Sequence, residues 1–281
     1  MNSSRADAVR QQHFVAACEL DVTALKPGNV RVGIPAHGMT ADDFLLSAQA
    51  CAPALSRRGA SIGQRVFEAV RRTQRVVHCN TNLGIVLLAA PLFRAAEAGG
   101  DLHTSVTHQL AGLDRDDAML VYRAIRLARP GGLGTSERHD VSAEPQVTLL
   151  EVMREAQGRD SVARQYAQGY GDVFGPGLSH WRRAVARFED EQWAATVVYL
   201  MYLSTWRDSL IERKYGSATA QTVLERAREI QSQLSAYADP SDMEAPLLSW
   251  DRELRDAGLN PGTSADLTVA TVFAAKLTPA V

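Results

Sequence analysis

The chain has 281 residues, of which 46% are apolar and 22% are charged, and its formal net charge is -2 at pH 7. This composition is typical of a globular protein and excludes a disordered or fibrous one. Without a basic surplus, nucleic acid is not expected as the main partner. Cys18, Cys51 and Cys79 include no C-x-x-C pair, so they suggest neither a disulfide framework nor a zinc motif, and they fit a reducing cytoplasm.

The N-terminal segment, MNSSRADAVRQQHF, lacks the apolar core of a signal peptide. The most apolar run, residues 83–93, is too short to span a bilayer and ends against Arg94. We therefore expect a cytoplasmic protein with no membrane partner, in which residues 83–93 belong to a buried helix.

Apolar residues recur at helical spacing along nearly the whole chain, and the period of two expected of strands is nearly absent. The first helix is predicted over residues 6–24 and ends at Pro27-Gly28. The next two begin with capping boxes, Thr40 with Asp43 and Ser61 with Gln64. Later helices are predicted over residues 83–98, from 114 to the stop at 130–132, and over 146–157, 160–173, 179–188, 190–213, 218–237, 241–257 and 264–277. Since no linker or internal repeat divides the chain, we predict one all-α domain of about ten helices over residues 1–281.

Polar residues gather at the junctions between these helices, which makes the junctions the candidate binding regions. H-E-x-x-H, P-loop and G-x-G-x-x-G motifs are all absent from the sequence. The junctions contain Glu19 with Lys26 and Asn29 (ELDVTALKPGNV), His37 (GIPAHGM), Asn80 to Asn82 (HCNTNLG), Asp140 (RPGGLGTSERHDV), Asp208 with Arg213 (WRDSLIERKYG) and Asp266 (LNPGTSADL).

Each junction also has a purely structural interpretation. Glu19 could form a surface ion pair, and His37 could simply be exposed. Asn80 or Thr81 could cap the helix that follows, and the helix dipole favours an acid such as Asp266 in a first turn. The functional interpretation is that amides at helix N-termini bind phosphate.

The segments KPGNV and NPGTSAD are similar Pro-Gly junctions at opposite ends of the chain. A helical domain often brings its two ends together, so we expect these junctions to meet. Cations, amides and carboxylates converging from several junctions would suit a magnesium-chelated polyphosphate.

In this order, the segments resemble the triphosphoribosyl-dephospho-CoA synthase family, whose members prepare the prosthetic group of citrate lyase and malonate decarboxylase. The matching segments are Glu19 followed by KPGNV, then AHGMTADDFLLSA, NTNLG and NPGTSADL, from about residue 15 to residue 277. The stretch that begins RPGGLG and continues to residue 174 resembles a branch of the family from some archaea and methylotrophic bacteria.

The resemblance implies an all-helical fold and a transferase. ATP would donate its 5-triphosphoribosyl group to the 2'-hydroxyl of 3'-dephospho-CoA, or of a related cofactor acceptor, and adenine would leave. Mg²⁺ would be the cofactor, with ATP as a substrate. The expected partners are small-molecule nucleotides and cofactor precursors, and a homodimer is left open.

The resemblance also suggests roles for individual residues. Glu19, Asp266 and Asp208 are the predicted catalytic acids, because a carboxylate can stabilise an oxocarbenium-like state or accept the proton of the acceptor hydroxyl. The predicted ATP and phosphate contacts are Lys26, Gly28, Asn29, His37, Asn80, Thr81, Asn82 and Arg213. The predicted metal ligands, beside the phosphates, are Glu19, Asp140 and Asp208.

Two positions depart from the citrate-lyase branch. Leu83 stands where that branch has the lysine of N-T-H-K-G, and Ser209-Leu210 follow Asp208 where it has D-T-N. A charged hydrogen bond contributes about 1.5–3 kcal/mol. Three interpretations are open: Arg75 or Arg213 replaces the lysine, the acceptor belongs to another pathway such as one-carbon metabolism, or the family lysine does not touch the substrate.

Two alternatives to the transferase remain open at this point. One is a magnesium-dependent hydrolase of nucleotides or N-glycosides. The other is a non-catalytic nucleotide-binding protein that acts in the biosynthesis of a one-carbon cofactor of the pterin or furan type.

Overall fold

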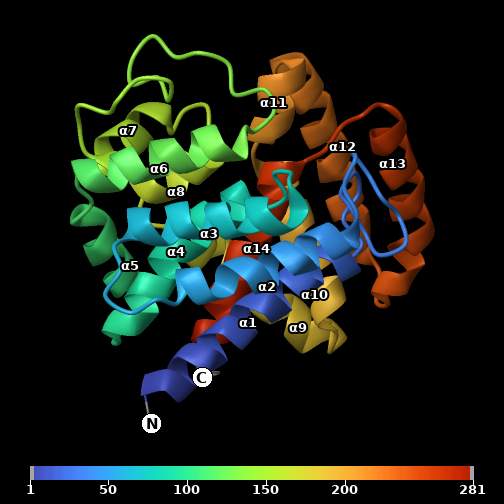
Figure 1. The fold of residues 1–281 in the computed structure, drawn as a ribbon. Coiled ribbons are helices and arrows are strands. Elements are labelled where there is room, and N and C mark those ends of the chain that lie inside the picture. The colour runs from blue at the N-terminus through green and yellow to red at the C-terminus, as the bar shows by residue number, and fades with distance from the viewer. Residues whose placement is uncertain (1–2, 279–281) are drawn as a thin grey trace.

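The computed structural model describes residues 3–278 and is helical throughout (Figure 1). Its elements are α1 (Ser3–Thr23), α2 (Ala41–Leu55), α3 (Ile62–Val77), α4 (Leu83–Ala98), α5 (Leu102–Ala111), α6 (Arg115–Ala128), α7 (Leu149–Ala156), α8 (Ser161–Ala167), the π-helical η1 (Val173–Gly177), α9 (Leu178–Phe188), α10 (Glu191–Thr205), α11 (Ser209–Tyr215), α12 (Ser217–Ala236), the 3-10 turn η2 (Pro240–Met243), α13 (Glu244–Asp256) and α14 (Gly262–Leu277). Within these residues, β-structure is limited to two isolated bridges, Arg31–Ile34 and Ala36–Met39. The all-α prediction is confirmed, although residues 3–278 form fourteen α-helices rather than about ten.

Two of the predicted helices have wrong boundaries for local reasons, and one helix was not predicted. The helix predicted over 190–213 is two helices, because Trp206 is extended (φ -129°, ψ 144°) and the Asp208 side chain caps the N-terminus of α11. The helix predicted over 160–173 ends early, because Gly169 and Tyr170 have positive φ. The sequence analysis missed α5, whose first turn is capped by Asp101.

Side-chain caps define where several helices begin. The predicted capping boxes of Thr40 with Asp43 and Ser61 with Gln64 are both present and fix the starts of α2 and α3. Asp114 with Asp117 and Thr148 with Glu151 do the same for α6 and α7. Such caps fix the directions in which helices leave their loops, and so they help to place the loops.

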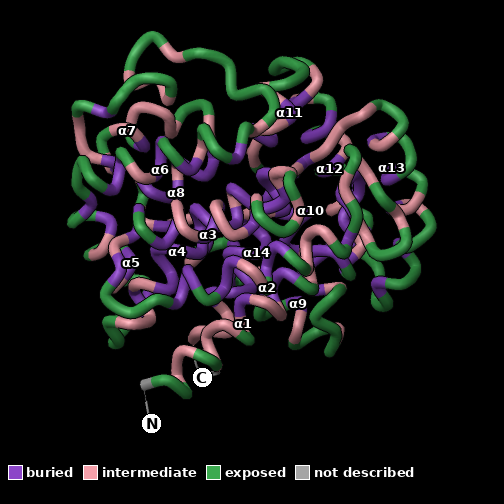
Figure 2. Tube along the Cα trace, viewed as in Figure 1, coloured by how far each residue is buried: buried purple, intermediate pink, exposed green. Residues whose placement is uncertain are grey.

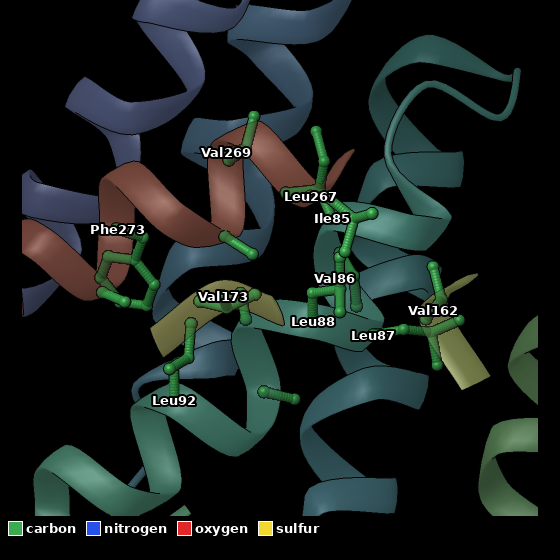
Figure 3. Close-up of a cluster of buried hydrophobic side chains, with 14 of the residues drawn as sticks. Ile85, Val86, Leu87, Leu88, Leu92, Val162, Val173, Leu267, Val269 and Phe273 are labelled. Atoms are coloured by element: carbon green, nitrogen blue, oxygen red, sulfur yellow. The ribbon is translucent and has the colours of Figure 1, made fainter. Parts of the chain in front are cut away.

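Helices α4 and α14 form the centre of the molecule. Eleven of the sixteen residues of each are buried, as expected for helices that are apolar all round. In Figure 1 the red helix α14 runs through the middle, and Figure 2 shows the same region buried. Figure 3 shows side chains of both helices in one apolar cluster. Phe93 and Phe273 join them, with ring centroids 4.7 Å apart, and Phe14 of α1 packs on both.

Helix α4 contains a proline, and the surrounding structure compensates for it. Pro91 has no N–H to donate, so the carbonyl of Leu87 lacks its helical partner. The Tyr166 hydroxyl donates to that carbonyl over 2.7 Å, and the Tyr170 hydroxyl donates to the Leu88 carbonyl over 2.8 Å. The central helix is thus held on its α8 side by two buried tyrosines.

Among residues 3–278, no single helix is long and apolar enough to cross a membrane. The pair α4 and α5 meets that criterion only jointly, across a bend of 112°.

Candidate active site

A cavity of about 670 Å³ lies beside the N-termini of α4 and α14. Its inner wall, as we call the polar set Asp21, Asn29, Thr81, Asn82 and Asp266, is largely buried. Its outer wall consists of α6, α7 and the exposed loop 129–148 between them. The cavity therefore joins a polar inner end to a more exposed and more apolar outer end.

The KPGNV loop places a buried ion pair at the inner wall. Lys26 is only 3% exposed, and its ammonium donates to the carboxylate of Asp21 and, over 3.0 Å, to Oδ1 of Asn29. The ammonium also lies 5.7 Å from the ring centroid of Tyr199, whose hydroxyl donates to the Pro27 carbonyl. Asp21 and Asn29 line the cavity and Lys26 does not. The predicted phosphate contact of Lys26 is therefore indirect in this structure, because the ammonium is committed to holding Asp21.

Gly28 joins the two ends of the chain. Its φ is +83°, and a Cβ here would lie 2.9 Å from both the Leu259 carbonyl oxygen and Cδ of Pro261, so only glycine fits. One residue on, Asn29 Nδ2 donates to Asn260 Oδ1 over 2.6 Å. The expected meeting of the two Pro-Gly junctions is confirmed. Gly28 itself acts through the backbone and does not line the cavity.

Asp266 faces the cavity from the first turns of α14, directly against α4. A Cβ on Gly84 would lie 2.6 Å from Cγ of Asp266, so the glycine of NTNLG makes room for this carboxylate. Burial first, and then the negative charge of Asp21, raises the pKa of Asp266 well above its ordinary value. Asp266 is thus an acid that lies in the cavity as predicted.

Glu19 does not lie with these groups. Its side chain is exposed on the outer face of α1 and does not line the cavity. The acid that reaches the cavity from α1 is Asp21, which the sequence analysis missed. Helical spacing contains the signal, because Asp21 follows Phe14 by seven residues and Cys18 by three, and both of those are buried.

Asp208 is buried but turned away from the cavity. Its Oδ1 accepts the N–H groups of Leu210 and Ile211, and its Oδ2 accepts the N–H and the hydroxyl of Ser264. Burial raises the pKa of Asp208, although these hydrogen bonds oppose the rise. Because four donors already occupy the carboxylate, Asp208 ties α11 to the start of α14, and the structure does not support its predicted catalytic and metal-binding roles.

The three residues that precede α4 in the chain, Asn80, Thr81 and Asn82, all line the cavity. Asn80 Oδ1 accepts the N–H of Leu83, which is the capping alternative, and the hydroxyls of Thr81 and Ser47 are hydrogen-bonded over 2.6 Å. Asn82 makes no side-chain cap, and its amide lies 3.6 Å from Sγ of Cys51. The Asn82 amide is therefore the member of the set least committed to the fold.

His37 also lines the cavity, with Nε2 3.2 Å from the Gly28 carbonyl oxygen. This hydrogen bond shows that the imidazole supports the KPGNV loop from the rim.

Two further predicted residues lie on the outer side. Asp140 lines the cavity, but it organises its own loop by accepting hydrogen bonds from the hydroxyl of Ser142 and from the N–H groups of Ser136 and Ser142. These hydrogen bonds lower the pKa of Asp140 to about 2. Arg213 lines the cavity and pairs with Asp160 at 3.2 Å, while its buried Nε has no hydrogen-bond partner. Arg75, the other candidate to replace the missing lysine, does not line it.

The predicted metal ligands do not form a preassembled cage. Among the described residues, no group of three or more His, Cys, Asp or Glu side chains is placed to hold an ion. Asp21 and Asp266 supply two carboxylates to one cavity, which fits Mg²⁺, an ion usually bound by one or two carboxylates together with substrate phosphates. Glu19 and Asp208 do not line the cavity, and Asp140 lines it but already accepts three hydrogen bonds from Ser136 and Ser142.

Comparison with known proteins identifies the family. The chain matches the CitG family, described as ATP:dephospho-CoA triphosphoribosyl transferase, over residues 8–280. It belongs to this family. A crystal structure from Archaeoglobus fulgidus, provisionally described as a triphosphoribosyl-dephospho-CoA synthase, has a similar fold. Its TM-score is 0.68 at 27% sequence identity, and the match covers 83% of this chain and 96% of that one. No curated protein sequence gives a significant match.

The CitG assignment confirms the resemblance read from the motifs, and with it the transferase class and the triphosphoribosyl transfer from ATP to dephospho-CoA. It favours the transferase over a hydrolase or a non-catalytic binding protein. The catalytic roles of individual residues stay predictions.

Proposed function

We propose that this cavity is where the transfer takes place. The 2'-hydroxyl of 3'-dephospho-CoA attacks the anomeric carbon of the ATP ribose, and the bond from that carbon to adenine breaks. Adenine leaves with the bonding electron pair and takes up a proton from water, and the triphosphate stays on the transferred ribose. The observation that carries this proposal is the presence of two carboxylates, Asp21 and Asp266, on the inner wall beside the N-termini of α4 and α14.

Asp266 is our candidate for the general base. A carboxylate whose pKa is raised is a stronger base than an ordinary one, so it suits removal of the hydroxyl proton. Gly84 allows this carboxylate to approach α4, and the rigid first turns of α14 hold it in place.

Asp21 is our candidate for stabilising the positive charge that develops at the anomeric carbon. Its ion pair with Lys26 and the hydrogen bond from Lys26 to Asn29 fix its position before substrate binds. In this arrangement Lys26 and Asn29 are positioning residues, because they act through Asp21.

The triphosphate fits the remaining features of the inner end. The N-termini of α4 and α14 are favourable for anions, and Arg213, which reaches the cavity from its outer side, offers a guanidinium whose Nε still lacks a partner. Mg²⁺, when bound, would neutralise part of the triphosphate charge and would be held by Asp21 or Asp266 together with phosphate oxygens.

The prediction of an acceptor from one-carbon metabolism depended on Leu83. Leu83 does line the cavity, and so does Arg213, one of the two cations expected to replace the family lysine. Dephospho-CoA is therefore the acceptor to test first, and pterin and furan precursors are the comparison. A homodimer and a cytoplasmic location remain predictions.

The test is adenine release from ATP, Mg²⁺ and 3'-dephospho-CoA by purified protein, followed by chromatography. We expect Asp266→Asn and Asp21→Asn each to lower the rate by roughly a hundredfold or more, while Glu19→Gln, the exposed neighbour on α1, leaves it unchanged. Since Asp21→Asn leaves the buried Lys26 unpaired, the double variant D21N/K26Q controls for folding. A normal rate in the folded Asp266→Asn variant would remove Asp266 from the reaction.

A further inference from the structure

The outer end of the cavity differs in chemistry from the inner end. Ile125 of α6 and Val152 and Ala156 of α7 line it and are only partly buried. Leu133 and Val141, from the loop 129–148, add apolar surface on the same side. Apolar surface that stays exposed inside a cavity is suited to the uncharged part of a ligand, so we refer to these five residues as the apolar wall.

Two cations lie at this end with little to neutralise them. Lys214 lines the cavity, and its ammonium makes no ion pair or hydrogen bond within residues 3–278. Arg159 also lines it, and the only hydrogen bond of its side chain in that part of the chain is to the Ser136 hydroxyl, at 3.1 Å. The acids nearest in sequence are already paired, Glu212 with Arg207 and Asp160 with Arg213.

The glycine-rich loop is fitted to Lys214. A Cβ on Gly131 would lie 2.9 Å from Cε of Lys214, and a Cβ on Gly132 would lie 2.7 Å from its Cγ. The lysine stem therefore passes against both glycines, and Figure 1 shows the loop running from α6 across to α11. A lysine near a helix C-terminus is common, since it interacts well with the dipole. That role, however, does not require a loop packed along the side-chain stem.

The backbone of this loop adds donors. Gly132 and Gly134 have φ of +70° and +64°, whereas Gly131 and Leu133 do not have positive φ. Alternation of this kind turns successive N–H groups toward one side, an arrangement that binds anions. In Figure 2 the loop is mostly exposed, and residues 131–134 are all exposed.

The reaction itself requires two anion sites. Donor and acceptor must be bound together when the hydroxyl attacks, and each carries a chain of phosphates. Like charges repel strongly where water is excluded, so one set of cations cannot serve both. The inner end, with its helix N-termini and carboxylates, fits the donor. The unneutralised cations beside the apolar wall then remain for the acceptor.

We infer that Lys214, Arg159 and the loop residues 131–134 form a second anion subsite, which binds the phosphates of the acceptor while the apolar wall holds the acceptor's uncharged arm. This inference rests on the proposed function, since it places the second substrate of the same reaction. It makes Lys214 and Arg159 residues that determine acceptor affinity rather than catalytic residues.

Equilibrium binding measured by calorimetry tests the subsite without requiring turnover. We expect the double variant K214Q/R159Q to bind 3'-dephospho-CoA at least about tenfold more weakly than the wild type, the scale of a lost charged contact, and to bind Mg-ATP within about twofold of it. The matched control is Arg154→Gln, an exposed arginine of α7 that does not line the cavity; it should change neither affinity. Val152→Ser should weaken binding of 3'-dephospho-CoA but not of ADP, which lacks the arm.

The possible outcomes separate the two proposals. If the double variant loses affinity for ATP as much as for dephospho-CoA, the cations belong to the donor and the inference is wrong. If neither affinity changes, or if the wild type does not bind dephospho-CoA, the inference is also wrong. Normal adenine release by a variant with unaltered acceptor affinity would refute the subsite and leave the proposed function standing. If the double variant selectively loses acceptor binding but even the wild type releases no adenine, the subsite is supported and the proposed function is refuted.

Discussion

At the scale of single residues, three aspartates show how surroundings give one side chain different properties. The carboxylate of Asp21 is held by a buried lysine, and that of Asp208 by four hydrogen bonds from backbone and serine donors. Asp266 faces the cavity, where burial and neighbouring negative charge raise its pKa. Of the three, Asp266 is the one that both lines the cavity and has a raised pKa. This combination is typical of a functional group rather than a structural one.

The raised pKa of Asp266 predicts a stability that depends on pH. A carboxyl whose pKa is higher in the folded state than in the unfolded state favours folding when protonated. The stabilisation of the folded state by this carboxyl is therefore complete below the ordinary carboxyl pKa, near 4, and is lost as pH rises through the folded-state pKa. Asp266→Asn imitates the protonated form, so we expect the variant to melt at a higher temperature than wild type at neutral pH. The difference should shrink as the pH falls toward about 4.

Thermal melts of both proteins across that pH range measure this difference, and the comparison variant is Asp208→Asn. The asparagine amide cannot accept both hydrogen bonds from Ser264, so Asp208→Asn should melt at a lower temperature at every pH where Asp208 is charged. A pH-independent difference for Asp266→Asn would contradict the raised pKa.

At the scale of the elements, the sequence contains enough information to predict the helices and the loops that matter. Capping boxes at Thr40 and Ser61 and glycine stops are local signals, and the structure confirms both boxes. The break at Asp208 was missed because WAATVVYLMYL continues in helical period into α11. Only the cap formed by the Asp208 side chain shows that a new helix begins.

The candidate site was only partly predictable for a related reason. Motif order correctly predicted that Asn29, Asn82 and Asp266 share a region, because the motifs themselves surround it. The choice of Glu19 over Asp21 depended on which face of α1 is buried; the spacing from Phe14 and Cys18 indicates that face, whereas the motif does not. Lys214 could not be found from the sequence, because only tertiary structure brings it under the loop 129–148.

The contact between α4 and α14 leads to a prediction about Gly84. Alanine is favoured over glycine inside a helix by about 1 kcal/mol, so Gly84→Ala should not unfold the protein. Its Cβ would meet the end of a side chain, that of Asp266, and not backbone. The carboxylate would have to turn away from α4, so we expect adenine release to fall by roughly a hundredfold, as for loss of the base itself.

Circular dichroism and the adenine assay together check this prediction. Gly99→Ala is not a fair control, because Gly99 has positive φ at the end of α4. A better control is Gly158→Ala, where a Cβ meets nothing within 4 Å and φ is not positive. Near-normal activity in a folded Gly84→Ala protein would show that Asp266 need not keep its present position.

At the scale of the whole molecule, the cavity connects distant parts of the chain. The loop after α1, the N-terminus of the central helix α4 and the final helix α14 all contribute to its inner wall. Asn29 and Asn260 are hydrogen-bonded across that wall although 231 positions separate them in sequence. A ligand bound here contacts segments that the unfolded chain does not hold together, so its binding free energy adds directly to the stability of the fold.

Magnesium should therefore strengthen the stabilisation by ATP. At 100 times its Kd, a ligand that binds only the folded state adds about 2.7 kcal/mol, which for a chain of this size raises Tm by roughly 5 °C. Without the metal, the triphosphate would face Asp21 and Asp266 with no positive charge between them, so we expect a clearly smaller shift in EDTA. Scanning fluorimetry with ATP, with and without Mg²⁺, measures both shifts, and Glu19→Gln should behave as wild type because its side chain lies outside the cavity. Equal shifts in EDTA and in Mg²⁺ would mean that the two carboxylates do not lie against the phosphates, and the ATP would then have to bind in a different orientation from the one proposed.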